Sequence, residues 1–268
     1  MTEIQENELE ILKKFDEVCR NHGLCYYIAY GTCLGSLRHK GFIPWDHDID
    51  VLMPIEDAVK LMGYQEEFGK RYFLSNRLTN EKHTSISYKV YDLQRKVVTT
   101  KRDKVYPPTY DSMDIYPLYH CPPGRVRLLL NIWRSHLYKL LVASGLPENH
   151  GKFMKILSRV MLFVFRFIDK EKTIRRLERK LAYKGEYKEV ADYFGKDVTL
   201  CTAITYKKEW FAEPKEMRFE GHLFLGPTCP KKYMARRYGR DFMTPPPQSE
   251  IEGECIREFI KDEEGMDN

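Results

Sequence analysis

Cysteine pairs in C-x-x-C spacing are absent from this sequence, and its seven cysteines are an odd number scattered over 268 residues. Structural zinc sites commonly use such pairs, and small secreted folds commonly use an even set of disulfide partners. The absence of both patterns argues against a structural zinc ion and against a disulfide framework. Because thiols stay reduced in the cytosol, the sequence predicts a cytoplasmic protein.

Long apolar runs free of charge are also lacking. The apolar stretch from Ile156 to Ile168 is shorter than the about 20 residues that a membrane-spanning helix needs, and Arg159 and Arg166 interrupt it. The first ten residues, MTEIQENELE, are polar and acidic and do not resemble a signal peptide. The sequence therefore predicts no spanning helix and at most a peripheral contact with the inner face of the cell membrane.

Signals for nucleic-acid binding are missing as well. The chain has no R-G-G tract, no basic tail and no zinc-finger spacing, and its net charge of +5 is modest. This balance favours anionic partners and gives no reason to expect nucleic acid.

The hydrophobic fraction of 43% is ample for a buried interior. We expect three regions: a core over residues 1–120, a helical lobe over 121–190, and a C-terminal segment over 191–268 that packs back on the core. No internal repeat is visible.

The core shows helical and extended patterns in turn. Helices are expected over residues 4–20, 32–39 and 56–69, and over 230–238 near the C-terminus, where Gly239 ends the pattern. Short strands are expected near residues 24–30, 71–75, 85–91, 96–100 and 113–116. These elements predict an α+β fold with a mixed β-sheet flanked by helices.

Residues 124–183 differ in composition from the rest of the chain, because they contain long apolar segments interrupted by arginine and lysine. Two interpretations stay open. The segments form amphipathic helices on an anionic membrane surface, or they form a lobe that packs on the core with its basic side chains facing outward.

The most informative stretch is residues 30–53, YGTCLGSLRHKGFIPWDHDIDVLM. Asp46, Asp48 and Asp50 alternate with other residues, so in a β-strand their carboxylates share one face. Such an alignment concentrates negative charge, which a divalent metal would neutralise. The alternative is a solvated strand edge or a polar turn after Pro44.

The glycine turn before the acidic run has its own interpretation. A strand over residues 24–30 leads into Gly31 and Thr32, which open a predicted helix. Backbone N–H groups at a helix start bind phosphate, and Gly31 permits its close approach. The alternative is a plain strand-to-helix turn with Thr32 as the N-cap.

These motifs together resemble the LicD/fukutin family of the nucleotidyltransferase superfamily. The family pattern is a Gly-Ser/Thr turn, matched by Gly31 and Thr32, then a D-x-D strand, matched by Asp48 and Asp50. Its third acidic residue is matched by Asp114 within DSMDIYPL.

The stretch FEGHLFLGPTCPKKYMARRYGRDFMTPPP is similar to the family's closing segment. Two departures are His47, where the family commonly has aspartate, and Thr32, where other branches of the superfamily have serine.

The resemblance implies a nucleotidyltransferase-like catalytic core over residues 1–120. It implies transfer of phosphocholine or an alditol phosphate from a CDP-linked donor to a hydroxyl of a cell-surface or lipid-linked glycan, with release of CMP. Asp48, Asp50 and Asp114 are then the expected ligands of Mg²⁺ or Mn²⁺, with Asp114 a ligand, a general base or both. The competing interpretation is an enzyme that transfers the nucleotidyl group itself to a small molecule, sugar or protein.

Five further residues are expected at the substrate. Arg38 and Lys40 suit the donor phosphates, or else form a solvated loop. Trp45 is expected to stack on cytosine or choline, or to anchor the core. Asp46 is expected to orient the other carboxylates, and Glu220 is either an acid on the acceptor side or the cap of a turn.

Overall fold

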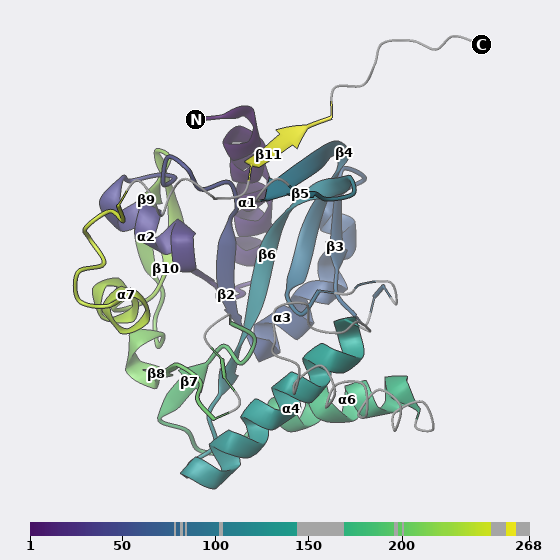
Figure 1. Ribbon diagram of the computed structural model, residues 1–268, viewed down its shortest axis with the longest axis vertical. Coiled ribbons are helices and arrows are strands. Elements are labelled where there is room, and N and C mark those ends of the chain that lie inside the picture. The colour runs from purple at the N-terminus through teal and green to yellow at the C-terminus, as the bar shows by residue number, and fades with distance from the viewer. Residues whose placement is uncertain are drawn as a thin grey trace.

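The computed structural model describes residues 1–77, 79–80, 83, 85–101, 104–143, 169–195, 198–199, 201–247 and 256–260. Its architecture is a mixed β-sheet with helices packed against it and a pair of helices at one end (Figure 1). The α+β fold class predicted from the sequence is confirmed.

Helices and strands are interspersed along the described chain. The helices are α1 (Glu3–Asn21), α2 (Tyr30–Arg38), α3 (Ile55–Leu61), α4 (Arg125–Ala143), α6 (Lys170–Leu181) and α7 (Pro230–Tyr238), with 3₁₀ turns at Met62–Phe68 and Lys208–Trp210. The strands are β1 (Tyr27–Ile28), β2 (Asp50–Pro54), β3 (Tyr72–Ser75), β4 (Tyr88–Lys101), β5 (Lys104–Val105), β6 (Thr109–His120), β7 (Glu189–Ala191), β8 (Thr205–Lys207), β9 (Lys215–Phe219), β10 (His222–Gly226) and β11 (Ile256–Phe259).

Helix α1 matches its sequence pattern closely. The Thr2 hydroxyl accepts the Gln5 N–H at 3.2 Å while the Gln5 side chain accepts the Thr2 N–H at 3.0 Å, so a capping box starts the helix. Leu9, Leu12 and Phe15 are buried on the face that packs on the sheet.

The main sheet runs in the order β1-β2-β6-β4-β11. Strand β2 is parallel to β6 and the other pairs are antiparallel, which makes the sheet mixed. Strands β3 and β5 also pair with β4, while β7 and β8 extend the far end of β6. The hairpin β9–β10 forms a separate sheet.

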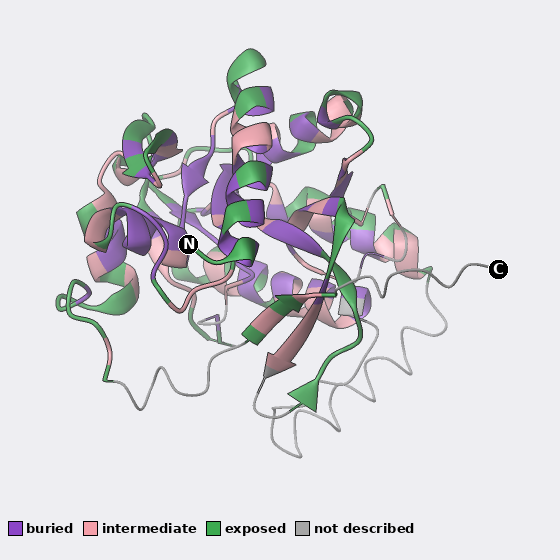
Figure 2. Cartoon of the chain, turned by 90° about the horizontal axis from the view of Figure 1, so that it is seen from above, coloured by how far each residue is buried: buried purple, intermediate pink, exposed green. Residues whose placement is uncertain are grey.

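The two faces of this sheet differ in what covers them. Helices α1 and α3 pack against the sheet (Figures 1 and 2), and Val90, Met113 and Ile115 are fully buried in one apolar cluster with side chains of both helices. Because side chains alternate along a strand, their neighbours Lys89 and Asp114 point to the opposite face. That opposite face carries the candidate site.

Several expected elements differ in extent. The strand expected over residues 24–30 is only Tyr27–Ile28, because Tyr30 adopts φ +45° and already begins α2. The strands expected over 85–91 and 96–100 are one strand, β4, with a bulge between Asp92 and Lys96. The helix expected over 56–69 is α3 followed by a 3₁₀ turn.

The helical lobe consists, in its described part, of α4 packed against α6. Ile132 and Leu141 of α4 and Ile174 and Leu177 of α6 are buried in one apolar cluster. The apolar stretch predicted from Ile156 to Ile168 lies outside the described residues. Within the ranges that are described, no helix has the length and apolar character needed to cross a bilayer.

Candidate active site

Asp50 and Asp114 lie side by side on neighbouring parallel strands. The register of β2 and β6 pairs Asp50 with Asp114, and the Asp114 N–H donates to the Ile49 carbonyl at 3.0 Å. Paired residues on adjacent strands are about 4.8 Å apart and share a face. The structure therefore brings two of the three predicted metal ligands together on the sheet face opposite α1.

Asp48 and Asp46 add negative charge to this pair. Asp48 is exposed, Ile49 is fully buried and Asp50 is half-buried. Burial raises the pKa of the Asp50 carboxyl well above its usual range, and the charges of Asp48, Asp114 and Asp46 raise it further. The acidic residues predicted from the sequence thus form one electrostatically coupled group.

The prediction that Asp46 to Asp50 form a strand is wrong for residues 46–49, because β2 begins only at Asp50. Side chains from distant elements hold this segment instead of a strand ladder. The Gln5 amide donates to the Asp46 carbonyl at 2.9 Å, and Arg257 donates to the His47 carbonyl at 2.6 Å.

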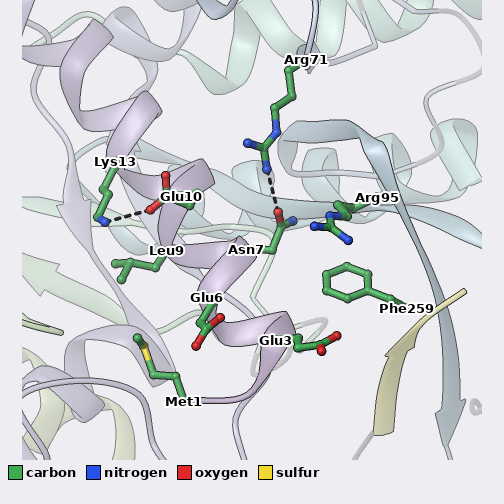
Figure 3. Close-up of a pocket in the computed structure, with 10 residues that line it drawn as sticks. All are labelled: Met1, Glu3, Glu6, Asn7, Leu9, Glu10, Lys13, Arg71, Arg95 and Phe259. Carbon is green, nitrogen blue, oxygen red and sulfur yellow. Dashed lines mark hydrogen bonds and ion pairs between the residues drawn. The ribbon is translucent and has the colours of Figure 1, made fainter. Parts of the chain in front are cut away.

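Arg257 belongs to a buried network of charges. Its guanidinium bonds the carboxylates of Glu8 at 2.7 Å and Asp111 at 2.5 Å, and both acids are fully buried. The Asn7 amide donates to the other Asp111 oxygen at 2.8 Å, and Arg71 donates to Asn7 at 2.9 Å, as Figure 3 shows. This network connects α1, β6 and the C-terminal strand β11 to the acidic segment.

Gly31 and Asp46 are in direct contact. A Cβ atom added to Gly31 would collide with the Asp46 carboxylate, which therefore lies against the first turn of α2. The helix start was expected to cradle a phosphate. A phosphate and Asp46 would repel each other there unless a cation lay between them.

Thr32 is buried and holds the start of β2. Its hydroxyl accepts the Asp50 N–H at 2.9 Å, and the Asp50 carbonyl in turn accepts the Ala29 N–H at 2.9 Å. Thr32 was expected to bind substrate or to cap the helix. In this structure it fixes the backbone of a predicted ligand.

Replacing Thr32 with valine is therefore expected to lower enzymatic activity about ten-fold and to destabilise the fold by about 1–3 kcal/mol. The reason is that the Asp50 N–H loses its acceptor in a buried place. Thr32→Ser, which keeps the hydroxyl, is the matched control. Product formation and chemical unfolding are the measurements, and a Thr32→Val protein equal to Thr32→Ser in both would contradict the assignment.

The Asp114 carboxylate is held by two residues that sequence reasoning missed. The Lys89 ammonium bonds one Asp114 oxygen at 2.8 Å, and the Ser87 hydroxyl donates to the other. Burial alone would lower the pKa of Lys89, but the Asp114 charge and hydrogen bond raise it above its usual value. These two contacts hold the Asp114 carboxylate in place, and only the β4–β6 register could have revealed the ion pair.

Arg38 and Glu220 are engaged in contacts within the protein. The Arg38 guanidinium donates to the carbonyls of Phe242 and Thr244, so it fastens the segment after α7. The Glu220 carboxylate accepts the Phe42 N–H at 2.8 Å and packs on Gly41. These contacts fit the alternative in which Glu220 fixes a turn.

The other two predicted substrate residues are Lys40 and Trp45. Lys40 is exposed, with φ +63°, and its carbonyl accepts the Glu220 N–H at 2.8 Å. Trp45 is half-buried and packs against the main apolar core.

Tyr238 at the end of α7 is a further residue near the carboxylates. It is 45% exposed, and burial around its hydroxyl raises its pKa to about 12, with contributions from the charges of Asp50 and Asp46. Next to it, the Arg237 guanidinium lies 4.1 Å from the centre of the Tyr30 ring. The Tyr238 ring thus lies near the acidic group, and the Arg237 guanidinium next to it lies over Tyr30.

The chemistry of this group fits a hard divalent cation. Carboxylate oxygens are the ligands that Mg²⁺ and Mn²⁺ prefer, and a cation would relieve the repulsion that raises the pKa of Asp50. As they stand, the described side chains include no group of three His, Cys, Asp or Glu residues already placed around one metal position. Lys89, paired with Asp114, supplies the positive charge in this conformation.

Known proteins are similar to this chain in sequence. Residues 23–120 match the model of the LicD/FKTN/FKRP nucleotidyltransferase domain. The chain is 27% identical over 264 residues to the lipopolysaccharide cholinephosphotransferase LicD of Haemophilus influenzae, covering 93% of this chain and 94% of that protein. An uncharacterized protein of Rickettsia prowazekii is 28% identical over 121 residues, 41% of this chain and 44% of that protein.

The matched region contains the glycine turn, the acidic segment and Asp114, and the similarity to LicD continues through the lobe and the C-terminal segment. Residues 23–120 therefore form a nucleotidyltransferase domain of the LicD/FKTN/FKRP family, and the chain is a distant homologue of LicD over most of its length.

Proposed function

We propose that this protein transfers a phospho-substituent, phosphocholine or an alditol phosphate, from a CDP-activated donor to a hydroxyl of a cell-surface or lipid-linked glycan. The observation that carries the proposal is the Asp50–Asp114 pair, with Asp48 beside it and the start of α2 next to it. The name of the relative, a lipopolysaccharide cholinephosphotransferase, supports phosphocholine as cargo and a lipid-linked glycan as acceptor.

The donor diphosphate would lie on the α2 side of the sheet. Asp48 and Asp50 would hold Mg²⁺ or Mn²⁺ there, with Asp46 orienting the group and Tyr238 available to stack on the base. When bound, the metal would neutralise negative charge on the diphosphate and on the leaving CMP.

Asp114 would then act on the acceptor. As the acceptor oxygen forms its bond to the phosphorus of the transferred group, the bond from that phosphorus to the CMP oxygen breaks. Asp114 would take the hydroxyl proton, and Lys89 and Ser87 would keep its carboxylate in position for that transfer.

The alternative is transfer of the nucleotidyl group itself, because the same three carboxylates would serve either reaction. The products separate the two. The protein is incubated with CDP-choline, CDP-ribitol or CTP and Mg²⁺, and the nucleotide products are quantified.

We expect CMP from a CDP-linked donor and its loss when EDTA removes the metal. Pyrophosphate from CTP, with no CMP from either CDP-linked donor, would overturn the proposal in favour of the alternative.

The helical lobe offers a surface for an anionic membrane. Val126, Leu130 and Trp133 of α4 are 72%, 45% and 61% exposed and lie on one helix face at i, i+4 and i+7. The α4 sequence has no acidic residue, and α6 exposes Arg175 and Arg176 beside it. An exposed apolar stripe with tryptophan and surrounding positive charge suits the surface of anionic lipids.

We therefore expect the double variant Leu130→Ser, Trp133→Ser to bind vesicles of phosphatidylglycerol at least about ten-fold more weakly than the native protein, because two apolar side chains no longer enter the lipid. Leu223→Ser is the control, since Leu223 is 50% exposed on β10. Vesicle flotation measures the effect. Equal flotation of both variants would favour the alternative of a lobe packed on the core.

A further inference from the structure

A cavity of about 560 Å³ opens beside Asp114 on the same face of the sheet. This volume lies within the range of ~300–1,000 Å³ that is usual for small-molecule sites. Strands β3, β4 and β6 and the connection before β4 supply its walls. Its principal lining residues are Phe73, His83, Lys89, Tyr91, Thr109 and Tyr110.

The position of the cavity separates it from the expected donor side. The sheet order places β2 on one side of β6 and β4 on the other. Asp50 and the start of α2 are on the β2 side of Asp114, whereas the cavity is on the β4 side. Lys89 connects the cavity to Asp114, because its side chain lines the cavity and its ammonium group bonds the Asp114 carboxylate at 2.8 Å.

The lining is poorly suited to a nucleotide diphosphate. Among the described lining residues, Lys89 is already paired with Asp114, and His83 has both ring nitrogens in hydrogen bonds, to the Ser75 hydroxyl at 2.9 Å and the Ser87 carbonyl at 2.8 Å. Neither of these two described groups is therefore free to bind a diphosphate.

The other described lining residues are neutral, and several of them are aromatic or carry hydroxyl groups. The rings of Phe73 and Tyr91 are on facing residues of β3 and β4, and Tyr110 is 39% exposed on β6. Ser85 and Thr109 add hydroxyl groups. Aromatic faces next to hydroxyl groups match a sugar ring, which presents C–H groups on its faces and hydroxyl groups on its edge.

We propose that this cavity binds a carbohydrate ring of the acceptor, with Tyr91 and Tyr110 packing on the sugar and the attacking hydroxyl directed to Asp114. The inference rests on the proposed function, because a glycan acceptor is needed only for group transfer. It assigns the two substrates to opposite sides of Asp114.

Two variants test this assignment, Tyr91→Ala and Tyr110→Ala. Tyr106→Ala is the matched control, since Tyr106 is also 39% exposed, follows β5 outside the cavity, and has a lysine over its ring as Tyr110 does. Saturation-transfer NMR with methyl glucoside, methyl galactoside and methyl N-acetylglucosaminide measures sugar binding without any catalysis. CMP binding and hydrolysis of CDP-choline in the absence of acceptor measure the donor side.

We expect at least one glycoside to bind the native protein and the Tyr106→Ala control, and to bind both cavity variants about ten-fold more weakly. CMP binding and the hydrolysis of CDP-choline should stay within two-fold of native. Glycoside binding that is unchanged in both cavity variants, absent from the native protein, or accompanied by an equal loss of CMP binding would overturn the assignment.

Failure of the proposed function would look different. If the native protein released no CMP from any CDP-linked donor, the transfer reaction would be wrong whatever the glycosides do. If CMP is released but the cavity variants bind glycosides normally, only the place of the acceptor is wrong.

Discussion

Replacement of Asp50 by asparagine is expected to slow CMP release from the CDP-linked donor by about 10³-fold, or ~4 kcal/mol of transition-state stabilisation. Asparagine has nearly the same shape as aspartate but carries no charge. It would weaken the metal's hold on the diphosphate and so remove charge stabilisation from the leaving CMP, which is worth several kcal/mol. The rate of CMP release at saturating donor is the measurement.

The same Asp50→Asn variant is expected to unfold at a higher temperature than the native protein. Burial and the neighbouring acids raise the pKa of Asp50, so its ionised form is unfavourable in the folded state without a cation. Removing that charge should therefore stabilise the folded protein while it lowers activity. A variant that is less active but more stable has lost a metal ligand, whereas a variant with a damaged fold would be less active and less stable.

The control for this variant is Asp169→Asn, because Asp169 is the N-cap of α6 and asparagine caps a helix about equally well. It should change neither rate nor stability. An Asp50→Asn protein with native activity would show that the reaction occurs elsewhere, and one that loses both activity and stability would show that Asp50 has a structural role.

Replacement of Arg257 by leucine is expected to destabilise the protein by about 3–5 kcal/mol, because it leaves Glu8 and Asp111 buried without their cation. It should also lower activity, since the His47 carbonyl loses the guanidinium that holds the acidic segment. Arg257→Lys keeps the charge but not the paired donors, and should recover part of the stability.

The loss in Arg257→Leu should also depend on pH. Burial and Asp111 already raise the pKa of Glu8 well above its ordinary value of 4.5, and losing Arg257 would raise it further. At pH values above 4.5, the Glu8 carboxyl then holds its proton more firmly in the folded state than in the unfolded state. The free energy of unfolding therefore falls as the pH rises. The deficit relative to native should therefore be larger at pH 8 than at pH 5.

Urea unfolding at the two pH values measures this difference. Arg95→Leu is the control, because Arg95 is exposed beside β11 with its guanidinium 5.3 Å from the Phe259 ring (Figure 3). Its effect should stay within about 0.5 kcal/mol. A deficit that is equal at both pH values would contradict the role of the buried acids.

Patterns local in sequence predicted much of this fold. Helix α1 and helix α7 lie within one residue of their expected bounds, because an apolar stripe defines α1 and Gly239 ends the α7 pattern. The juxtaposition of Asp50 with Asp114 followed from the family resemblance, and the parallel register of β2 and β6 provides it.

The parts that sequence reasoning missed depend on contacts between distant residues. Lys89 meets Asp114 through the β4–β6 register, and Arg257 reaches the acidic segment from the last strand of the chain. Arg38 looked like a phosphate ligand because of its place in the motif, yet its guanidinium fastens the segment after α7. No spacing within a single segment reveals such partners.

Binding of Mn²⁺ in the presence of CDP-choline, followed by electron paramagnetic resonance, tests most directly whether Asp48 and Asp50 hold a metal against the donor diphosphate. Native protein should bind Mn²⁺ more tightly when CDP-choline is present, and Asp48→Ala should weaken that binding at least about ten-fold, while Asp169→Asn binds as native. Equal Mn²⁺ binding by native and Asp48→Ala proteins would contradict the account.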